Sequence, residues 1–362
     1  MAVSIRDVAN HAGVSIATVS RVLNNTDYPV SDAVRHQVLK SAQELEYVPN
    51  HSARNLRKRE GNGLALIVRN IGDPYYLPIV RGVTETALKY DSLAMVFNSM
   101  QDTLLEKRFY QRLQEWQLSG VLIGGGGYRT SEHDSVRRMI CALQSMGLKT
   151  IALAPQDMKM PMVAIDNFNA GREITYYLIR HNHRRIAFIG GYVNHISDEE
   201  RLMGYRVVLE SMGIPYDPKY VARKEFSWQG GYDCCMQLLK SGAKFTAICC
   251  SNDHLAYGAL RCLNDMGLRV PQDMSLTGMG NFPVGHGYGI GAQSDETKLE
   301  LTTVGFPLYE LGRRAVELLL GQEELPQTRI LLPVEVIERN SVAKIRGSAC
   351  ADVWPDWRLV KS

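Results

Sequence analysis

The residues whose types and spacing most clearly indicate a binding role lie near the N-terminus, on one face of a predicted helix. Short side chains on this face allow close approach to another surface, and the single arginine can donate two parallel hydrogen bonds to a guanine edge. The pattern therefore indicates reading of base edges in a DNA groove. The residues concerned are Ser15, Ala17, Thr18, Ser20 and Arg21.

A first helix and a sharp turn must precede this face. Ser4 and Asp7 have the spacing of a capping box, which predicts a helix start just before the apolar position Val8. Gly13 suits the turn, and the small side chain of Ala9 allows two helices to cross closely. These features predict the first half of a helix-turn-helix.

The second helix is expected to run from Ile16 to about Asn24. Ser15 stands where a side-chain oxygen can cap its first turn. The buried stripe of this helix is predicted to consist of Val14, Val19 and Val22. An ordinary helical hairpin with a solvated arginine is the alternative, because short motifs give false positives.

The next segment favours the DNA interpretation. Ser31 can cap a third helix, whose apolar face is predicted to hold Val34, Val38, Ala42 and Leu45. The following stretch, 47–59, has four basic residues in its last six positions and no acid among them. Such a run fits contact with DNA phosphates.

A second group of residues suits a pocket for a polyol. Trp228 can stack on a sugar ring, and Arg201 can donate a fork of hydrogen bonds. Asn252 and Asp253 can bond hydroxyl groups, although Asp253 could equally cap a helix. Trp228 could instead be a partly exposed packing residue.

Short apolar strands separated by helix-length stretches must position this second group. Because such alternation is typical of parallel sheets with crossover helices, we expect an α/β architecture. About 280 residues exceed one ordinary α/β domain, which favours two lobes with a cleft between them. The predicted strands are Leu64–Val68, Leu93–Phe97, Val121–Ile123, Thr150–Leu153, Arg185–Ile189, Ala247–Cys250 and Ser275–Thr277.

The composition is consistent with a soluble multidomain protein. The chain has 362 residues, 45% of them hydrophobic, and its net charge of +3 is too small to argue for nucleic acid by itself. Seven cysteines without Cys-x-x-Cys spacing fit reduced thiols. No signal-peptide pattern and no membrane-length apolar run occur, so we expect a cytoplasmic protein with no membrane contact.

Several weaker signals do not support another function. The glycines of 124–127 lack a dinucleotide-binding register and are interpreted as a cleft-lining loop. His181 and His183 are two residues apart at a helix end, which is unsuitable for a shared metal. No hydrolase elbow or zinc-protease motif is present, so we expect no enzyme activity, no metal and no cofactor. A sugar-binding transport protein remains the alternative function.

Residues 5–24, IRDVANHAGVSIATVSRVLN, resemble the DNA-binding signature of the LacI/GalR family of bacterial regulators nearly throughout. The resemblance implies that Ile16, Ala17 and Arg21 read bases. It also implies that 50–59 is a hinge helix that folds on operator DNA, with Leu56 wedged into the minor groove. Asn50, Arg54 and Arg57 are the other candidate DNA contacts of this segment.

The resemblance extends to about Val342 and implies a core of the periplasmic-binding-protein type. The similar segments are 73–76, 164–171, 183–191, 201–205, 251–261 and 301–304. By this resemblance the effector contacts are Tyr75, Tyr76, Arg201, Trp228 and Asn252.

Two departures bear on the effector. The family's sugar binders usually carry acids where this chain has Ala154 and Gly280. Asn281 could compensate in part, but an amide lacks the charge that strengthens hydrogen bonds. The effector could therefore be a larger glycoside or a modified sugar, or there could be none.

The expected organisation is a helix-turn-helix domain (1–49), a hinge helix and linker (50–61), and a two-lobed effector-binding and dimerisation core (62–342). The lobes are expected to interleave, with the first formed by about 62–162 and 293–322. No role is assigned to the tail, 343–362. The expected partners are operator DNA, a sugar-like effector and a second copy of the chain, since two half-sites require two reading heads. We expect repression, with activation left open.

Overall fold

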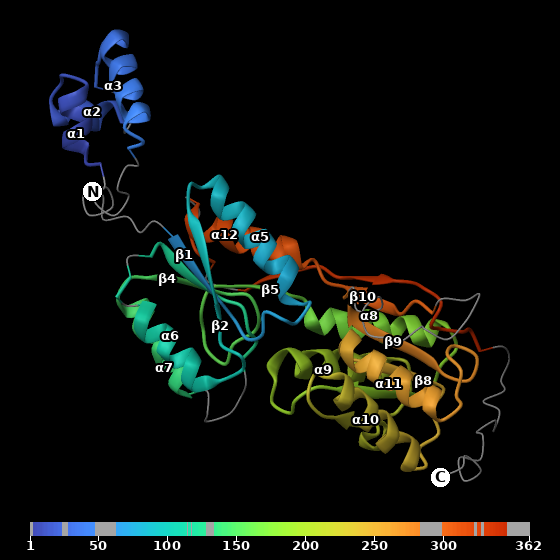
Figure 1. Cartoon of the computed structure of the whole chain (residues 1–362). Coiled ribbons are helices and arrows are strands. Elements are labelled where there is room, and N and C mark those ends of the chain that lie inside the picture. Colours follow the sequence, from blue (N-terminus) through green and yellow to red (C-terminus); the bar gives the residue numbers. More distant parts are fainter. Residues whose placement is uncertain are drawn as a thin grey trace. The chain divides into compact units, whose positions relative to one another are not determined.

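The computed structural model describes residues 3–23, 28–47, 63–113, 115–116, 118–127, 134–282, 299–321, 324–326 and 329–345. The chain divides into two compact units, Met1–Glu60 and Gly61–Ser362. The first unit is helical, and the second contains two parallel-stranded lobes (Figure 1). In the described residues, no helix is both long and apolar enough to span a bilayer.

Three short helices form the N-terminal unit: α1 (Ile5–His11), α2 (Ile16–Leu23) and α3 (Asp32–Glu44). The predicted capping box is present, because Ser4 Oγ accepts from the Asp7 N–H and the Asp7 carboxylate accepts from the Ser4 N–H. Gly13 adopts φ +60°, the left-handed conformation that its turn requires. Ser31 stands at the N-cap of α3, but its side chain makes no capping hydrogen bond.

The core of this unit is small and follows the predicted apolar stripes. Val19 and Val22 of α2 are buried against α1 and α3, and Val14, Val34 and Leu45 pack around them. The buried members of the cluster are Val8, Ala9, Ala12, Val19, Val22, Val38 and Ala42.

The first lobe is a six-stranded parallel sheet in the order β11-β5-β4-β3-β1-β2. Strand β1, next to the edge strand β2, is fully buried. Leu64, Leu66 and Val68 face the apolar cluster that includes α5 and α12, whereas Ala65 and Ile67 face that of α6 and α7. The strands are β1 (Gly63–Val68), β2 (Leu93–Asn98), β3 (Gly120–Ile123), β4 (Lys149–Ala152), β5 (Met162–Ile165) and β11 (Arg329–Leu332). The helices are α5 (Tyr76–Lys89), α6 (Thr103–Leu113), α7 (Asp134–Ser145) and α12 (Leu308–Leu320).

The second lobe repeats this plan with the order β12-β10-β9-β8-β6-β7, in which only β12 is antiparallel to its neighbour. Its strands are β6 (Ile186–Gly190), β7 (Val221–Arg223), β8 (Ala247–Cys250), β9 (Ser275–Gly280), β10 (Thr302–Gly305) and β12 (Glu335–Ile337). Its helices are α8 (Asn167–Arg180), α9 (Ile196–Ser211), α10 (Trp228–Lys240), α11 (Asp253–Asp265) and the 3-10 turn η2 (Pro218–Tyr220).

Glycines bring the helices of each covering pair into backbone contact. A Cβ added at Gly258 of α11 would lie 2.0 Å from the Trp228 carbonyl oxygen of α10, and one at Gly171 of α8 would lie 2.0 Å from the Arg201 carbonyl oxygen of α9. Gly82 and Gly312 do the same for α5 and α12. The crossings set the positions of the helix N-termini, which lie at the carboxyl edges of the sheets.

The α/β fold with two parallel-sheet lobes is confirmed, but the expected lobe boundary is wrong in its second segment. Part of 293–322 belongs to the second lobe, because β10 (Thr302–Gly305) pairs with β9 of the second sheet. Helix α12, in the same expected segment, does lie in the first lobe, which also includes β5 and β11. Each change of lobe therefore lies later in the chain than the sequence pattern indicates.

The start of the expected tail is attached to the second lobe. Ala343 and Ile345 bind the segment after α8, where the His183 ring contacts the Ala343 carbonyl oxygen at 3.1 Å and the Ile345 N–H donates to the His181 carbonyl. Burial lowers the pKa of His183 to about 4, so this ring is neutral at neutral pH. Its other nitrogen lies 2.9 Å from Thr246 Oγ1. Within the described residues, His183 is a structural link and belongs to no cluster of metal-binding side chains.

Candidate DNA-reading face and effector site

The predicted reading face is solvent-accessible on α2. Ser15 caps the helix, because its Oγ accepts from the Thr18 N–H at 3.1 Å. Ser15, Ile16 and Ala17 are exposed, while Thr18, Ser20 and Arg21 are half-buried. Since Val19 and Val22 face the core, α2 presents one polar face with apolar Ile16 at its start.

Arg21 lies in the last turn of α2 and stacks on an aromatic ring from beyond the helix. Its guanidinium carbon is 3.8 Å from the centroid of the Tyr28 ring. The planar guanidinium is therefore held against Tyr28 at the end of the reading face. The hinge candidates Asn50, Arg54, Leu56 and Arg57 lie outside the described residues.

Arg201 of α9 is buried at the carboxyl edge of the second sheet. Its Nε donates to Asn167 Oδ1 at 2.9 Å and its Nη1 donates to the Ser251 carbonyl at 2.7 Å. The guanidinium carbon is also 4.9 Å from the Phe306 ring centroid. Burial lowers the pKa of Arg201, and arginine side chains in proteins stay protonated, so the group is cationic. Three neighbours on separate elements thus fix its orientation.

Tyr75 of the first lobe faces this arginine. Burial raises the pKa of Tyr75 to about 12, and the positive charge of Arg201 opposes the rise. The Tyr75 ring meets Tyr76 edge-on at 5.0 Å and Phe282 of the second lobe at 6.1 Å between centroids. Two predicted site residues from different lobes, Tyr75 and Arg201, therefore lie near each other, whereas Tyr76 is buried beneath Tyr75.

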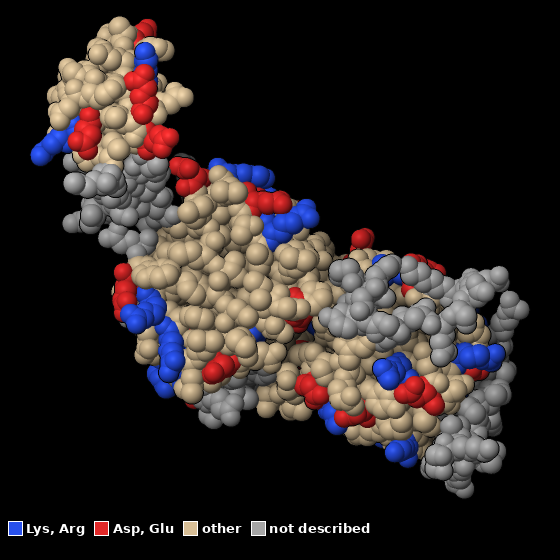
Figure 2. All heavy atoms as spheres, viewed as in Figure 1, with Lys and Arg blue, Asp and Glu red and all other residues tan. Residues whose placement is uncertain are grey.

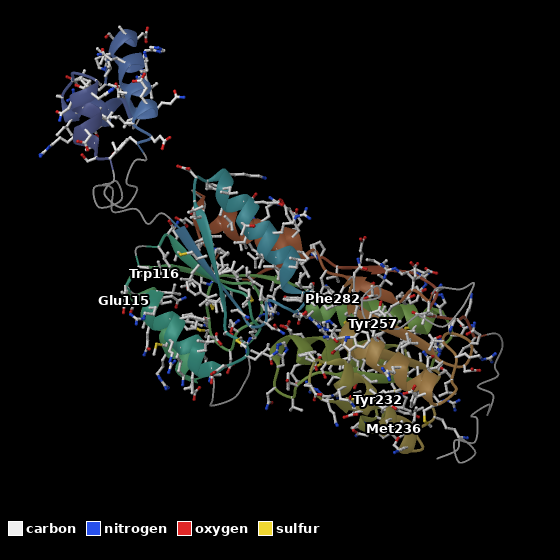
Figure 3. The ribbon with its side chains drawn as sticks, in the orientation of Figure 1. Glu115, Trp116, Tyr232, Met236, Tyr257 and Phe282 are labelled. Atoms are coloured by element: carbon white, nitrogen blue, oxygen red, sulfur yellow. The ribbon has the colours of Figure 1, made fainter. Side chains whose placement is uncertain are left out.

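Trp228 opens α10 and is stacked on another aromatic side chain. Its ring is 5.6 Å from that of Tyr257 on α11, with 12° between the ring planes. One face of the indole is therefore covered by Tyr257, and the side chain is half-buried. Figure 3 shows Tyr257 near Phe282 in the second lobe.

The amides predicted to bind hydroxyl groups are engaged in the protein. Asn252 is the N-cap of α11, where its Oδ1 accepts from the Leu255 N–H at 2.9 Å. Asn281 Oδ1 accepts from Arg339 at 2.7 Å. Each amide oxygen retains a second lone pair, so either side chain can still take part in ligand binding.

Asp253 links three elements of the second lobe and is not a helix cap. Its carboxylate accepts from Thr303 Oγ1 on β10 at 2.6 Å and from the Phe282 N–H at 2.7 Å. Burial raises the pKa of Asp253 to about 6, which these hydrogen bonds oppose. The cap that the sequence allowed for Asp253 is supplied by Asn252 instead.

The two positions without acids have different surroundings. Gly280 has φ +130°, and a Cβ added there would lie 2.4 Å from the Phe282 ring. An aspartate at 280 would therefore require Phe282 to move. Ala154 is buried just after β4, and its carbonyl oxygen accepts from Gln156 Nε2 at 3.2 Å.

The glycine run 124–127 contacts the second lobe. The Gly127 carbonyl accepts from the Ile196 N–H at the start of α9, at 3.1 Å. A Cβ added at Gly126 would lie 2.9 Å from His195 Nε2. The lobes also meet through an ion pair between Arg329 and Glu200 at 2.6 Å.

Phe226 is a candidate site residue that the sequence reasoning missed. It follows β7 and lies 5.1 Å from the His195 ring and 5.9 Å from Tyr192. His195 contacts Gly126 of the first lobe. Phe226 therefore lies near the junction of the two lobes, which the sequence alone does not indicate. The signal in the sequence that could have identified Phe226 is its aromatic side chain directly before Ser227, the N-cap of α10.

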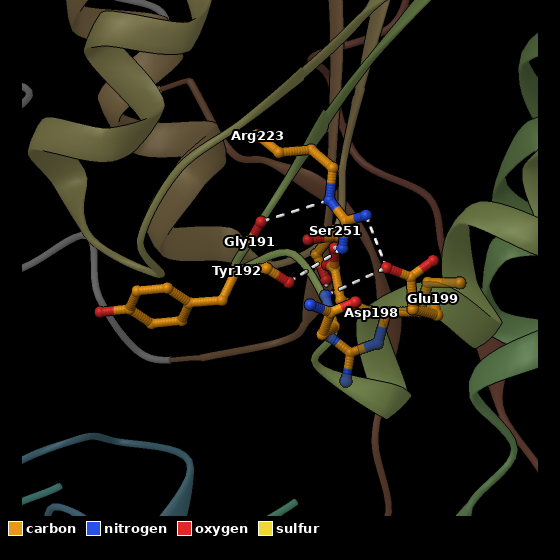
Figure 4. Close-up of polar contacts among 8 residues, drawn as sticks. Gly191, Tyr192, Asp198, Glu199, Arg223 and Ser251 are labelled. Carbon is orange, nitrogen blue, oxygen red and sulfur yellow. Dashed lines mark hydrogen bonds and ion pairs between the residues drawn. The ribbon is translucent and has the colours of Figure 1, made fainter. Parts of the chain in front are cut away.

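Arg223 forms an ion network beside this junction (Figure 4). Its guanidinium donates to Asp198 Oδ2 at 2.8 Å and to Glu199 Oε1 at 2.7 Å. It also donates to the carbonyl oxygens of Gly191 and Tyr192. The network anchors the first turn of α9 to the end of β7.

Two buried polar atoms at this edge have unused hydrogen-bonding capacity. Asp198 Oδ1 and Ser251 Oγ have no hydrogen-bond partner among the residues that the structure describes. Ser251 follows β8, and a Cβ added at Gly190, at the end of β6, would lie 2.9 Å from Asp198 Oδ2. A carboxylate and a hydroxyl group, neither apparent as site residues in the sequence, thus lie at the carboxyl edge that carries Arg201.

A helix-turn-helix with an accessible reading face, joined to a two-lobed parallel-sheet core, defines a DNA-binding regulator with a periplasmic-binding-protein-like core. Residues 4–50 match the family described as bacterial regulatory proteins, lacI family. Residues 62–339 match the periplasmic binding proteins and sugar binding domain of the LacI family. The chain belongs to the LacI family of bacterial transcriptional regulators.

Characterised relatives and solved structures agree with this assignment. The transcriptional repressor CytR of Escherichia coli K12 is 33% identical over 347 residues, covering 94% of this chain and 96% of the relative. A structure of the regulator CelR in complex with cellobiose is 28% identical over 94% of this chain and 99% of that one, with a TM-score of 0.68. The lac repressor dimer bound to operator and the anti-inducer ONPF shares the fold with a TM-score of 0.80, at 24% identity over 95% of this chain and 100% of that one. These relatives are transcriptional regulators and not enzymes.

Proposed function

We propose that the protein is a cytoplasmic repressor of carbohydrate-related genes, and that a sugar-like molecule between the lobes controls its binding to operator DNA. The observation that carries the proposal is the approach of Tyr75 in one lobe to Arg201 in the other. A ligand that bridges these two side chains interacts differently with open and closed lobes, which is the requirement for shifting a conformational equilibrium. The lac repressor and CelR structures, each with a small molecule bound, support this reading.

The proposed DNA contacts comprise both the reading face and the hinge. Ser15, Ile16, Ala17, Thr18, Ser20 and Arg21 would contact the major groove. Asn50, Arg54, Leu56 and Arg57 would act from a hinge helix within 50–61, between a DNA-binding domain at 1–49 and a core at 62–342. The hinge assignment rests on the resemblance of the sequence to the LacI family.

The proposed effector contacts are Tyr75, Tyr76, Arg201, Trp228, Asn252 and Asn281, to which the geometry adds Phe226 and Asp198. Asp198 Oδ1 supplies a carboxylate acceptor in a site that lacks acids at positions 154 and 280. Arg223 holds that carboxylate in place. The site therefore combines aromatic surface, one fixed cation and one carboxylate, which favours ligands with a broad ring face.

A second copy of the chain is proposed to cover an apolar surface of the first lobe. β2 is an edge strand in which every side chain is at least partly exposed, although the sequence is LAMVFN. Leu77 and Leu88 of the adjoining α5 and Leu93 of β2 are each about two-thirds exposed, at 67%, 65% and 66%. Figure 2 shows an area without charged side chains on this lobe, between those of α5 and α6. Because apolar edges are normally covered, and two half-sites need two heads, we infer a homodimer.

A sugar-binding transport protein is the second candidate function. It would account for the two-lobed core but not for α1–α3, which match the DNA-binding family over residues 4–50. We therefore prefer the regulator.

Replacing Arg21 by alanine is expected to cost about 1–3 kcal/mol of discrimination at one base pair, with binding to random DNA retained, because a guanine-reading fork is lost. The measurement is a titration of a selected operator, its single-base variants and random DNA. Lys40→Ala is the control, since it removes a positive charge from α3 away from the reading face. Equal loss on operator and random DNA would show that Arg21 contacts only phosphates.

Plain neutral monosaccharides are expected to bind weakly, whereas glycosides with an extended ring surface, sugar phosphates and uronic acids can use Trp228 and Arg201 more fully. A thermal-shift panel of these compounds tests this, because a ligand at 100 times its Kd stabilises the folded protein by about 2.7 kcal/mol. Since Arg201 is buried, its alanine variant is compared by the ligand-induced shift and not by its absolute Tm. Tight monosaccharide binding that survives both Trp228→Ala and Arg201→Ala would refute this site.

A further inference from the structure

The contact between Arg21 and Tyr28 joins the reading helix to the segment before α3. Arg21 is in the last turn of α2, and Tyr28 lies three residues before the N-cap Ser31. The guanidinium carbon lies 3.8 Å from the ring centroid, which is the separation of a close stack. The tyrosine is 55% exposed, so the ring is not held there as part of the apolar core.

Stacking of this kind orients an arginine without using its hydrogen-bond donors. The N–H groups of a guanidinium point outward in its plane, whereas the ring covers only a face of that plane. A stacked Arg21 can therefore still form a bidentate contact with a guanine edge. An arginine on a flexible stem loses rotamer freedom when it binds a base, and holding it beforehand reduces that loss.

We propose that Tyr28 is a positioning residue for base reading: its ring holds the Arg21 guanidinium in the orientation that contacts DNA. The inference rests on the proposed function, because it requires that Arg21 read a base. It assigns to Tyr28 a role in specificity that acts through Arg21 and needs only the aromatic ring.

Direct contact of the Tyr28 hydroxyl with a DNA phosphate is the competing explanation. The two explanations differ in three respects. A phosphate contact requires the hydroxyl group, persists when Arg21 is absent, and strengthens binding to all sequences alike. A positioning role requires the ring, vanishes without Arg21, and affects the preferred sequence more than random DNA.

A double-mutant cycle in the full-length protein separates them. An operator is first selected from random DNA with the unmodified chain, and its affinity relative to random DNA is then measured for Tyr28→Leu, Tyr28→Phe, Arg21→Ala and the Tyr28→Leu/Arg21→Ala pair. We expect Tyr28→Leu to lower this ratio roughly 2- to 5-fold, in line with an exposed cation–π contact. Tyr28→Phe should retain it, and Tyr28→Leu should have no further effect in the Arg21→Ala protein.

The inference is overturned if Tyr28→Leu reduces the ratio equally with and without Arg21, or if Tyr28→Phe is as impaired as Tyr28→Leu. In either case the operator still exists and the proposed function stands. If the unmodified chain selects no sequence, the proposed function fails and the inference fails with it. Circular dichroism of each variant confirms that the head is still helical.

Discussion

Changing Val19 to aspartate is expected to abolish DNA binding while the two-lobed core remains folded. Val19 is fully buried in a cluster with seven buried members among the residues that the structure describes. A buried carboxylate without a cationic partner costs several kcal/mol, and a unit of this size has only a few kcal/mol of stability. Because the core is a separate compact unit, it should not sense the change. Gel shifts with operator and random DNA measure the loss, and a calorimetric scan measures the core.

Two comparisons sharpen this test. Ala17→Asp puts the same charge on the exposed face of α2, so it should weaken DNA binding without unfolding the head. Val19→Ala keeps the position apolar and should retain much of the binding. DNA binding by Val19→Asp at the normal level would contradict the helix-turn-helix assignment, and a lower Tm of the core would contradict the independence of the two units.

Introducing glutamate at both Leu77 and Leu93 is expected to convert the proposed dimer into monomers and to weaken operator binding by about 100-fold or more. Both leucines are two-thirds exposed on the apolar surface of α5 and β2. Four charges in each dimer interface would face one another or lie buried without partners, which disfavours association. Two linked heads bind two half-sites with an avidity that one head lacks. Sedimentation velocity and operator titration measure the two effects.

Leu104→Glu is the matched control for this variant. Leu104 is a leucine of similar exposure, 64%, but it lies on α6, which covers the other face of the first sheet. This variant should remain dimeric and bind the operator normally. If Leu104→Glu dissociates the dimer and the Leu77/Leu93 pair does not, the dimer surface is on the wrong face of the lobe.

The three helices of the N-terminal unit could be predicted because their signals are local. The capping box of Ser4 and Asp7, the Ser15 cap and the Gly13 turn each involve residues within four positions of one another. The valines at 19 and 22 follow the helical period directly. Few alternative folds remain when the cap, the turn and the apolar stripe all predict the same helices.

The lobes were harder to predict because their organisation depends on pairings between distant segments. The short strand β10 could join either sheet on its own pattern, and only its pairing with β9 assigns it to the second lobe. The candidate effector site also depends on contacts between distant segments. Arg201 and Tyr75 could be named from the family resemblance, but Phe226, Asp198 and Ser251 become visible only when β6, β7, β8 and α9 are brought to one edge.

The missing acid at position 280 has a physical explanation in the structure. Phe282 occupies the space into which a side chain at 280 would project, and its own N–H binds Asp253. Replacing Gly280 alone by aspartate would therefore force a rearrangement of this loop. In the proposed effector site, an aromatic ring therefore takes the space of that acid.

Selection of binding sites from random double-stranded DNA by the full-length protein tests the central claim most directly. The account predicts enrichment of one short, approximately palindromic sequence, with half-sites matching the two heads of a dimer, and loss of that enrichment in the Val19→Asp protein. Recovery of no preferred sequence, or of the same sequence by Val19→Asp, would contradict the conclusion that α2 of this chain reads operator DNA.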